Sequence, residues 1–202
     1  MVQAVLSLVT IAEYLELEEA STEKHELFRG RVYAMAGGSS NHGNIIDSLA
    51  GACRDALREQ KPCRFVGESR KVLVQSSSSG YYPDGTIACP PNDLNPRHGT
   101  YDNPTVVFEV LSSSTASFDR GEKFDDYKML DSLQDYVLIE SEKPRVEVFS
   151  RLPDGRWAQS VYVKGSSISI PSVGIELSLD ELYENAVFES APSPPVTESA
   201  TP

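Results

Sequence analysis

The sequence predicts a mixed α/β (α+β) fold, in which a mixed central sheet is flanked by helices. Helical and strand patterns alternate along the chain in the order helix, strands, helix, strands, helix, strands. The length of 202 residues suits one domain with a short appendage, and 40% hydrophobic with 24% charged residues is an ordinary globular balance. We therefore expect one domain over residues 1–188. Residues 189–202 are rich in Pro, Ser and Thr, and we expect them to form a disordered tail.

The first third of the chain predicts a helix, a hairpin and a second helix. Thr10 and Glu13 form the pattern of a capping box, so the first helix should begin after Thr10 and run two to three turns. Residues 25–35 read as a hairpin that turns at Gly30. Ser40 or Asn41 could cap the second helix, whose apolar residues follow at helical spacing.

The remainder predicts strands around one further long helix. Residues 63–66 and 71–75 read as short strands separated by Gly67, and residues 81–89 as a strand that carries Asp84. Residues 90–103 read as a loop, and the almost unbroken apolar run 105–111 as a central strand covered on both faces. The expected later elements are a helix over 119–130, strands over 136–140, 145–151 and 157–163, and a short helix from 179 to 183.

Three cysteines, Cys53, Cys63 and Cys89, occur without a C-x-x-C pair. An odd number at these spacings argues against a disulfide framework and against a zinc knuckle. We expect three free, buried cysteines and a reduced cytoplasmic setting. The longest apolar runs are too short to cross a bilayer, and the apolar N-terminus lacks the features of a signal peptide, so it reads as the approach to a helix.

The formal net charge of −12 restricts how nucleic acid could bind. Proteins that hold DNA by charge alone are basic, because phosphate neutralisation dominates their affinity. This chain must therefore use a local patch and metal ions, or act on another substrate.

Several kinds of site are excluded because their sequence motifs are absent. The sequence contains no G-x-G-x-x-G, no phosphate loop, no H-E-x-x-H and no G-x-S-x-G elbow. His25, His42 and His98 lack metal-ligand spacing, and each reads as a surface or loop residue.

Two carboxylates remain as the candidate site. Glu109 lies within the apolar run 105–111, where a charge is costly unless it is paired or bound to a metal. A cation shared with Asp84 would satisfy it, and two carboxylates suit Mg²⁺ or Mn²⁺. A salt bridge to Arg or Lys, or a solvated face, would explain Glu109 equally well, and the pattern leaves these alternatives open.

The spacing of these residues resembles a known motif. Pro83-Asp84 followed by Phe108-Glu109-Val110-Leu111-Ser112 is similar to the PD-(D/E)xK motif of restriction-endonuclease-like proteins. Over residues 8–188 the chain resembles more closely the Uma-two-type family of that superfamily, long catalogued as a bacterial domain of unknown function. The residues that carry this resemblance are Thr10-Ile-Ala-Glu-Tyr-Leu15, His25-Glu-Leu-Phe-Arg-Gly-Arg-Val32, Tyr82-Pro-Asp84, Val107-Phe-Glu-Val-Leu-Ser112, Asp119-Arg-Gly-Glu-Lys123, Tyr127, Tyr136-Val-Leu-Ile139 and Arg145-Val-Glu-Val148.

The resemblance implies a restriction-endonuclease-like fold and a nuclease site at Asp84 and Glu109. Leu111 stands where the superfamily has its lysine, and the resemblance suggests that Lys123, on the following helix, takes that role. An ordinary surface position is the alternative for Lys123. Glu26 is a further candidate carboxylate, either a metal ligand or an acceptor behind the ligands, and a plain hairpin position explains it equally well. Glu68 is a weaker candidate.

The expected function is Mg²⁺- or Mn²⁺-dependent hydrolysis of phosphodiester bonds, with DNA favoured over RNA as substrate. A catalytically silent binding protein on the same fold, or a phosphodiesterase for a small phosphorylated molecule, are the alternatives. We also expect no membrane partner and a two-fold homodimer, with residues 145–163 as a possible pairing edge.

Overall fold

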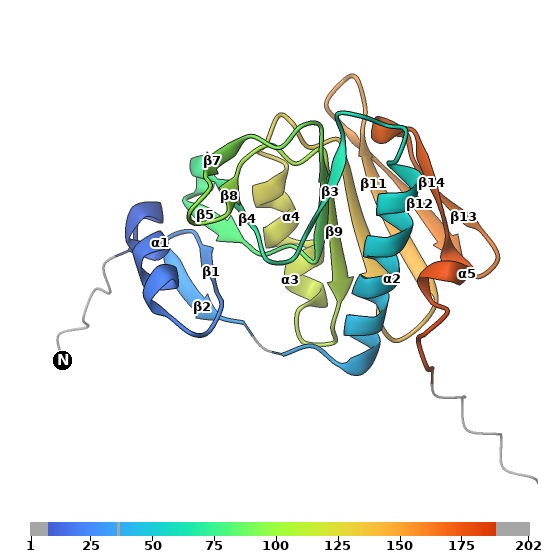
Figure 1. Cartoon of the computed structure of the whole chain (residues 1–202), viewed down its shortest axis with the longest axis horizontal. Coiled ribbons are helices and arrows are strands. Elements are labelled where there is room, and N and C mark those ends of the chain that lie inside the picture. The colour runs from blue at the N-terminus through green and yellow to red at the C-terminus, as the bar shows by residue number, and fades with distance from the viewer. Residues whose placement is uncertain (1–7, 36, 189–202) are drawn as a thin grey trace, which may run out of the picture.

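Two six-stranded sheets organise the computed structural model, which describes residues 8–35 and 37–188 (Figure 1). The central sheet has the order β12-β11-β10-β9-β6-β3, and the second sheet β2-β1-β5-β4-β8-β7. The expected mixed fold with a central mixed sheet is therefore confirmed. The central strands are β3 (Arg64–Gly67), β6 (Gly85–Ala88), β9 (Val106–Leu111), β10 (Asp135–Glu140), β11 (Arg145–Arg151) and β12 (Trp157–Val163).

The second sheet is built from shorter strands, and a separate hairpin lies outside both sheets. The second sheet contains β1 (His25–Phe28), β2 (Arg31–Ala34), β4 (Lys71–Val74), β5 (Ser79–Tyr81), β7 (Asp93–Asn95) and β8 (Thr100–Tyr101). The hairpin is β13 (Ser167–Ile170) with β14 (Ile175–Ser178). The helices are α1 (Ile11–Ala20), α2 (Ser40–Ala56), α3 (Ala116–Arg120), α4 (Glu122–Tyr127) and α5 (Leu179–Leu182), with 3₁₀ turns at Gln75–Ser77 and Pro171–Val173.

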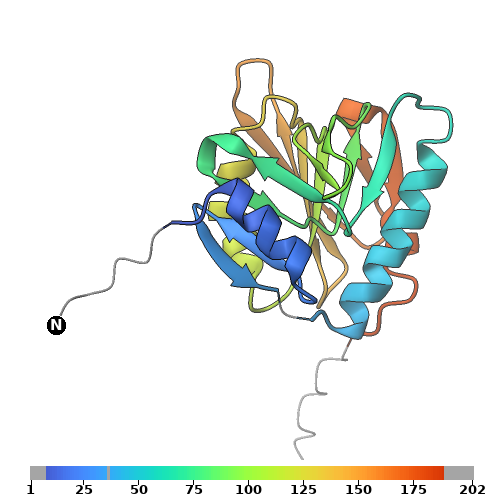
Figure 2. The same ribbon diagram turned by 60° about the vertical axis from the view of Figure 1, so that its left-hand side comes forward.

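The central sheet is buried on both faces, as the apolar run in β9 predicts. Alternate residues of a strand point to opposite faces. Val106, Phe108 and Val110 enter the core shared with α2, α5 and the β13–β14 hairpin. Val107 and Leu111 enter the other core, shared with α4 and the second sheet, and Glu109 falls on that side. Figures 1 and 2 show α2 on one face of the central sheet, with α3 and α4 on the other.

The chain passes from one sheet to the other just before Asp84. β5 belongs to the second sheet and β6 to the central sheet, so the predicted single strand over residues 81–89 is wrong. The segment is divided between the two sheets, and residues 82–84 connect them. β6 then pairs with β9 in antiparallel register, with Gly85 opposite Phe108. Asp84 therefore stands one step beyond this pair, beside Glu109.

The predicted long helix over 119–130 is also wrong in its bounds. It is divided at Gly121, which separates α3 from α4 and has φ −111° and ψ −100°. A Cβ there would lie 3.2 Å from the carbonyl oxygen of Ser117, so the break suits glycine. Gly121 alone does not distinguish a broken helix from a continuous one in the sequence. β9 and β10 are parallel, and α3 and α4 form the connection between them.

Other local predictions are confirmed or corrected in detail. The capping box at Thr10 and Glu13 is present, with both reciprocal hydrogen bonds. The cap of α2 is Ser39 rather than Ser40 or Asn41, and its hydroxyl accepts from the backbone N–H of His42. The predicted loop 90–103 contains β7 and β8, and the β13–β14 hairpin was not predicted.

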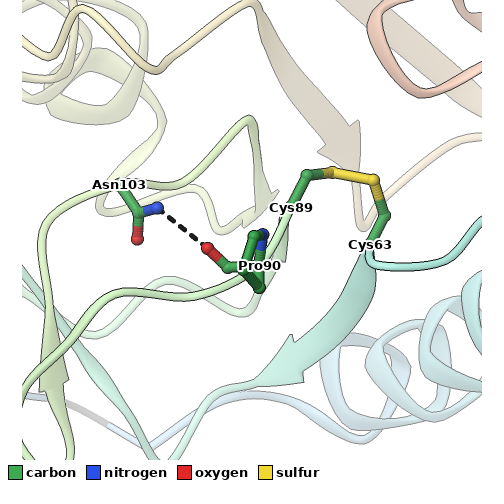
Figure 3. Close-up of a disulfide and its surroundings, with 4 residues drawn as sticks. All are labelled: Cys63, Cys89, Pro90 and Asn103. Carbon is green, nitrogen blue, oxygen red and sulfur yellow. Dashed lines mark hydrogen bonds between the residues drawn. A yellow bond between two sulfur atoms is a disulfide. The ribbon is translucent and has the colours of Figure 1, made fainter.

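Cys63 and Cys89 form a disulfide, which corrects the prediction of three free cysteines (Figure 3). β3 and β6 are antiparallel with Arg64 opposite Ala88, so the two cysteines face each other at the next step, with their Cα atoms 3.9 Å apart. Spacing along the sequence does not reveal this pair because it depends on strand register. Cys53 remains free and buried, as predicted.

Within residues 8–35 and 37–188, no helix is long and apolar enough to span a bilayer. The predicted tail over 189–202 and the predicted approach to the first helix before residue 8 lie outside the described residues.

Candidate active site

Glu109 occupies the middle of β9 and is 3% exposed. Its Oε1 lies 3.0 Å from the ammonium of Lys123 and accepts a hydrogen bond of 3.3 Å from the Tyr127 hydroxyl. Burial raises the pKa of Glu109 well above its ordinary value, against the opposing effect of the Lys123 charge. The salt bridge that the sequence left open as an alternative is therefore present.

Lys123 is the point at which several carboxylates meet. It lies in α4 and is 4% exposed, so it is not the surface lysine that the alternative interpretation required. Its ammonium lies 3.1 Å from Glu26 Oε1 and 3.7 Å from Asp119 Oδ1, besides its contact with Glu109. Burial by itself lowers the pKa of Lys123, but these carboxylates raise it well above its ordinary value. Lys123 is therefore a buried cation.

Asp84 is held by two donors from different elements. Its Oδ2 accepts a hydrogen bond of 2.6 Å from the backbone N–H of Val110, and its Oδ1 lies 3.1 Å from Nε2 of His42. The hydrogen bond to Asp84 raises the pKa of His42, although burial opposes this. The Nδ1 atom of His42 is buried and has no hydrogen-bond partner among the described residues.

Glu26 lies in β1 and joins the second sheet to this cluster. Its Oε1 accepts a hydrogen bond of 3.1 Å from the backbone N–H of Tyr82, in addition to its contact with Lys123. Tyr82 is itself fixed, because its hydroxyl donates to Glu18 at 2.6 Å and accepts from Lys71 at 2.9 Å. Tyr82, in the connection between the two sheets, therefore holds the carboxylate of Glu26 in place.

These side chains line one open cleft of about 1140 Å³. The cleft lies between the β1–β2 hairpin, the start of α2, the end of β9 and α3–α4. Six of its described lining residues are carboxylates, and Lys123 is the single lysine or arginine among them. The carboxylates are Glu26, Asp84, Glu109, Asp119, Glu122 and Glu142. Aromatic side chains also face the cleft, namely Phe28, Tyr33, Tyr82, Phe118 and Phe188.

The donor set suits a hard divalent cation with few protein ligands. In the part of the chain that the structure describes, no three His, Cys, Asp or Glu side chains are arranged to hold a metal ion. Mg²⁺, however, takes one or two carboxylates and completes its octahedron with water and substrate phosphate. Asp84 and Glu109 are two such carboxylates. Because Gly85 pairs with Phe108, Asp84 and Glu109 occupy the adjoining position of the two strands, and both line the cleft.

The structure thus brings together all four residues that the sequence predicts for the site: Asp84, Glu109, Lys123 and Glu26. Glu68, the weaker candidate, lines a neighbouring cavity that also contains Asp84 and His42. Tyr127 is buried in the core and also contacts Glu109.

Sequence reasoning missed His42 and Asp119. His42 was interpreted as a surface or loop residue, but it occupies the first turn of α2 and contacts Asp84. Its contact joins residues from different elements, and the only local signal was its place just after a predicted helix cap. Asp119 lies four residues before Lys123, and its side chain approaches that ammonium at 3.7 Å, even though α3 and α4 are separate helices.

Comparisons with known proteins identify the family of the chain. The model of the Uma2 family, described as "Putative restriction endonuclease", matches residues 11–180. The uncharacterized protein slr1290 of Synechocystis sp. is 34% identical over 177 residues, which is 87% of this chain and 92% of that protein. The uncharacterized protein sll1609 of the same organism is 35% identical over 158 residues, or 78% of this chain and 89% of that protein.

A solved structure has the same fold. It is a crystal structure from Anabaena variabilis, described as "a putative nuclease", with a TM-score of 0.70 and 16% sequence identity. The match covers 87% of this chain and 98% of that one. At this level of identity the likeness establishes the fold.

Proposed function

The chain belongs to the Uma2 family, and from this premise we propose that it is a metal-dependent endonuclease that hydrolyses phosphodiester bonds of nucleic acid. One observation carries the proposal. Asp84, Glu109, Lys123 and Glu26 come from separate elements and line one cleft, where Lys123 contacts two of the three carboxylates. Buried ionisable groups that converge in a cleft are characteristic of catalytic sites.

Asp84 and Glu109 would hold Mg²⁺ or Mn²⁺. Such an ion supplies Lewis-acid activation of a phosphoryl oxygen and lowers the pKa of a bound water. The backbone N–H of Val110 and Nε2 of His42 keep the carboxylate of Asp84 in place for this role.

Lys123 would supply the positive charge that the superfamily motif places at the position of Leu111. Leu111 is apolar and packs in the core, so it supplies no charge. The Lys123 ammonium would orient the attacking water or stabilise negative charge on the phosphate. Glu26 would act as a positioning residue, because its carboxylate contacts the ammonium and is fixed by the N–H of Tyr82.

A cleavage assay tests the proposal directly. Labelled single-stranded DNA, duplex DNA and RNA are incubated with Mg²⁺, Mn²⁺ or a chelator. The parent should cleave with metal and not with chelator, and Asp84→Asn should lose cleavage. Lys123→Met should lose about two to three orders of magnitude in rate. Asp55→Asn is the matched control, because Asp55 is an exposed residue of α2 whose pairing with Arg58 lies outside the cleft.

A metal titration separates the alternatives. Mg²⁺ or Mn²⁺ should stabilise the parent by about 2.7 kcal/mol at a hundredfold excess over the dissociation constant, and should not stabilise Asp84→Asn. Stabilisation by metal without turnover of any nucleic acid would favour a silent binding protein. Turnover of a chromogenic phosphodiester without nucleic-acid cleavage would favour a small phosphorylated substrate.

A further inference from the structure

The β1–β2 hairpin presents an aromatic surface directly beside the proposed reaction centre. Glu26 of β1 lies opposite Tyr33 of β2 in antiparallel register. Opposed residues of an antiparallel pair project to the same face, so the Tyr33 ring stands next to Glu26, whose carboxylate contacts Lys123 at 3.1 Å. Phe28 follows Glu26 on this face and packs edge-on against Phe118, with ring centroids 5.1 Å apart.

Tyr33 is exposed in a way that packing does not explain. Its exposed fraction is 49%, and that of Met35 two residues further along is 39%. Both residues line the cleft, and neither belongs to the two hydrophobic cores. β2 is the outer strand of its sheet (Figure 1). The Tyr33 ring is therefore a half-exposed part of the cleft lining on the outermost strand.

The charge of the cleft limits what can occupy it. Affinity for intact duplex comes largely from Lys and Arg contacts to phosphates. Among the described lining residues of the cleft there are six carboxylates, and the single lysine is buried and already paired with them. Apart from the proposed metal ion, a polyanion therefore needs another source of affinity. Base stacking on aromatic side chains is such a source, and it requires a base that is not paired inside a helix.

We propose that Tyr33 is the platform on which an unpaired nucleobase stacks beside the phosphate to be cleaved. The preferred substrate is then single-stranded or locally unpaired nucleic acid, not intact duplex. This inference rests on the proposed nuclease function for its position relative to the reaction, but the binding that it describes can be measured without catalysis. The cleft volume of about 1140 Å³ exceeds that of ordinary small-molecule pockets, roughly 300–1000 Å³, and has room for a base and its neighbours.

The test uses a single-stranded oligonucleotide that contains one 2-aminopurine, and the same strand annealed to its complement. Binding to the full chain is followed by anisotropy and by quenching of the 2-aminopurine, with and without Mg²⁺. We expect the parent to bind the single strand at least about tenfold more tightly than the duplex. Tyr33→Ala should weaken single-strand binding by about 5- to 150-fold, which corresponds to about 1–3 kcal/mol of stacking.

Two further variants make the result specific. Tyr33→Phe keeps the ring and should retain binding and quenching within about twofold, because stacking uses the face of the ring. Leu94→Ala removes a comparably exposed apolar side chain of β7, outside the cleft, and should change nothing. Since Tyr33 is half exposed, the melting temperature of Tyr33→Ala should remain near that of the parent.

The outcomes distinguish this inference from the proposed function. Equal affinity for duplex and single strand, or unchanged binding by Tyr33→Ala, would overturn the stacking role even if metal-dependent cleavage is observed. Conversely, Tyr33-dependent binding of the single strand without cleavage under any metal would support the stacking site and overturn the nuclease proposal.

Discussion

The ammonium of Lys123 and the carboxylate of Glu109 form an ion pair of 3.0 Å, in which both side chains are 5% exposed. The pair joins α4 to the central strand β9. A buried pair of this kind stabilises little by itself, but removal of one partner leaves the other charge uncompensated.

We therefore predict strong coupling between Lys123 and Glu109 in stability. Lys123→Met should lower the free energy of unfolding of the parent by roughly 3 kcal/mol, and that of the Glu109→Gln variant by less. Denaturant unfolding of the parent and the three variants measures the coupling. Lys128→Ala, which removes a more exposed pair with Asp125 outside this cluster, should cost no more than about 1 kcal/mol. Additive single effects would contradict the prediction.

The raised pKa of Glu109 predicts a pH dependence of stability. Because the folded chain holds this proton to higher pH than the unfolded chain, its stabilising contribution is complete below the ordinary carboxyl pKa of 4.5 and is lost as pH rises through the raised value. Lys123 stays charged throughout, since its pKa is raised above 10.5.

Relative to Glu109→Gln, the parent should lose up to about 1.4 kcal/mol per pH unit across this interval. Metal-free unfolding at a series of pH values gives the difference between the two proteins. A difference that grows in favour of the parent with rising pH would show that the pKa of Glu109 is lowered instead.

Reduction of the Cys63–Cys89 bridge should destabilise the chain. The bridge joins cysteines 26 residues apart, and closing a loop of that length restricts the unfolded state by roughly 3 to 4 kcal/mol. Unfolding with and without reductant measures the loss. The variant with both Cys63→Ser and Cys89→Ser should be insensitive to reductant, and an equal response of both proteins would assign the effect to something other than this bridge.

The outer strand β12 predicts a two-fold dimer. It pairs with β11 on one side, its seven residues include neither proline nor a charged side chain, and Val161 and Val163 are 48% and 56% exposed. A long uncharged edge is a template for pairing with another chain. Sedimentation should show a dimer for the parent and a monomer for Val161→Lys. A monomeric parent at high micromolar concentration would refute this expectation.

Local features of the sequence predicted most of the fold. The capping box at Thr10 and the hairpin at Gly30 depend on a few adjacent residues, and both are present. The apolar run of β9 indicated a central strand because burial on both faces leaves no polar alternation. Features that depend on distant pairing were missed. The passage of residues 82–84 between sheets and the Cys63–Cys89 bridge are both set by strand register.

The candidate site was predictable where the polarity of a residue differed from that of its sequence neighbours. Glu109 stood out because a carboxylate in an apolar strand needs a partner. His42 did not stand out, because its partner Asp84 is brought near only by tertiary packing. Lys123 required the resemblance, since an isolated lysine on a charged helix is ordinarily solvated.

The passage of the chain between two sheets at residues 82–84 has a consequence for biosynthesis. Glu26 is translated early and belongs to one sheet, whereas Glu109 belongs to the other sheet and Lys123 to the helix behind it. A nascent chain cannot bring Glu26, Glu109 and Lys123 together until α4 has left the ribosome and both sheets have packed around it. A copy that is truncated before α4 therefore lacks Lys123 and cannot form the cluster.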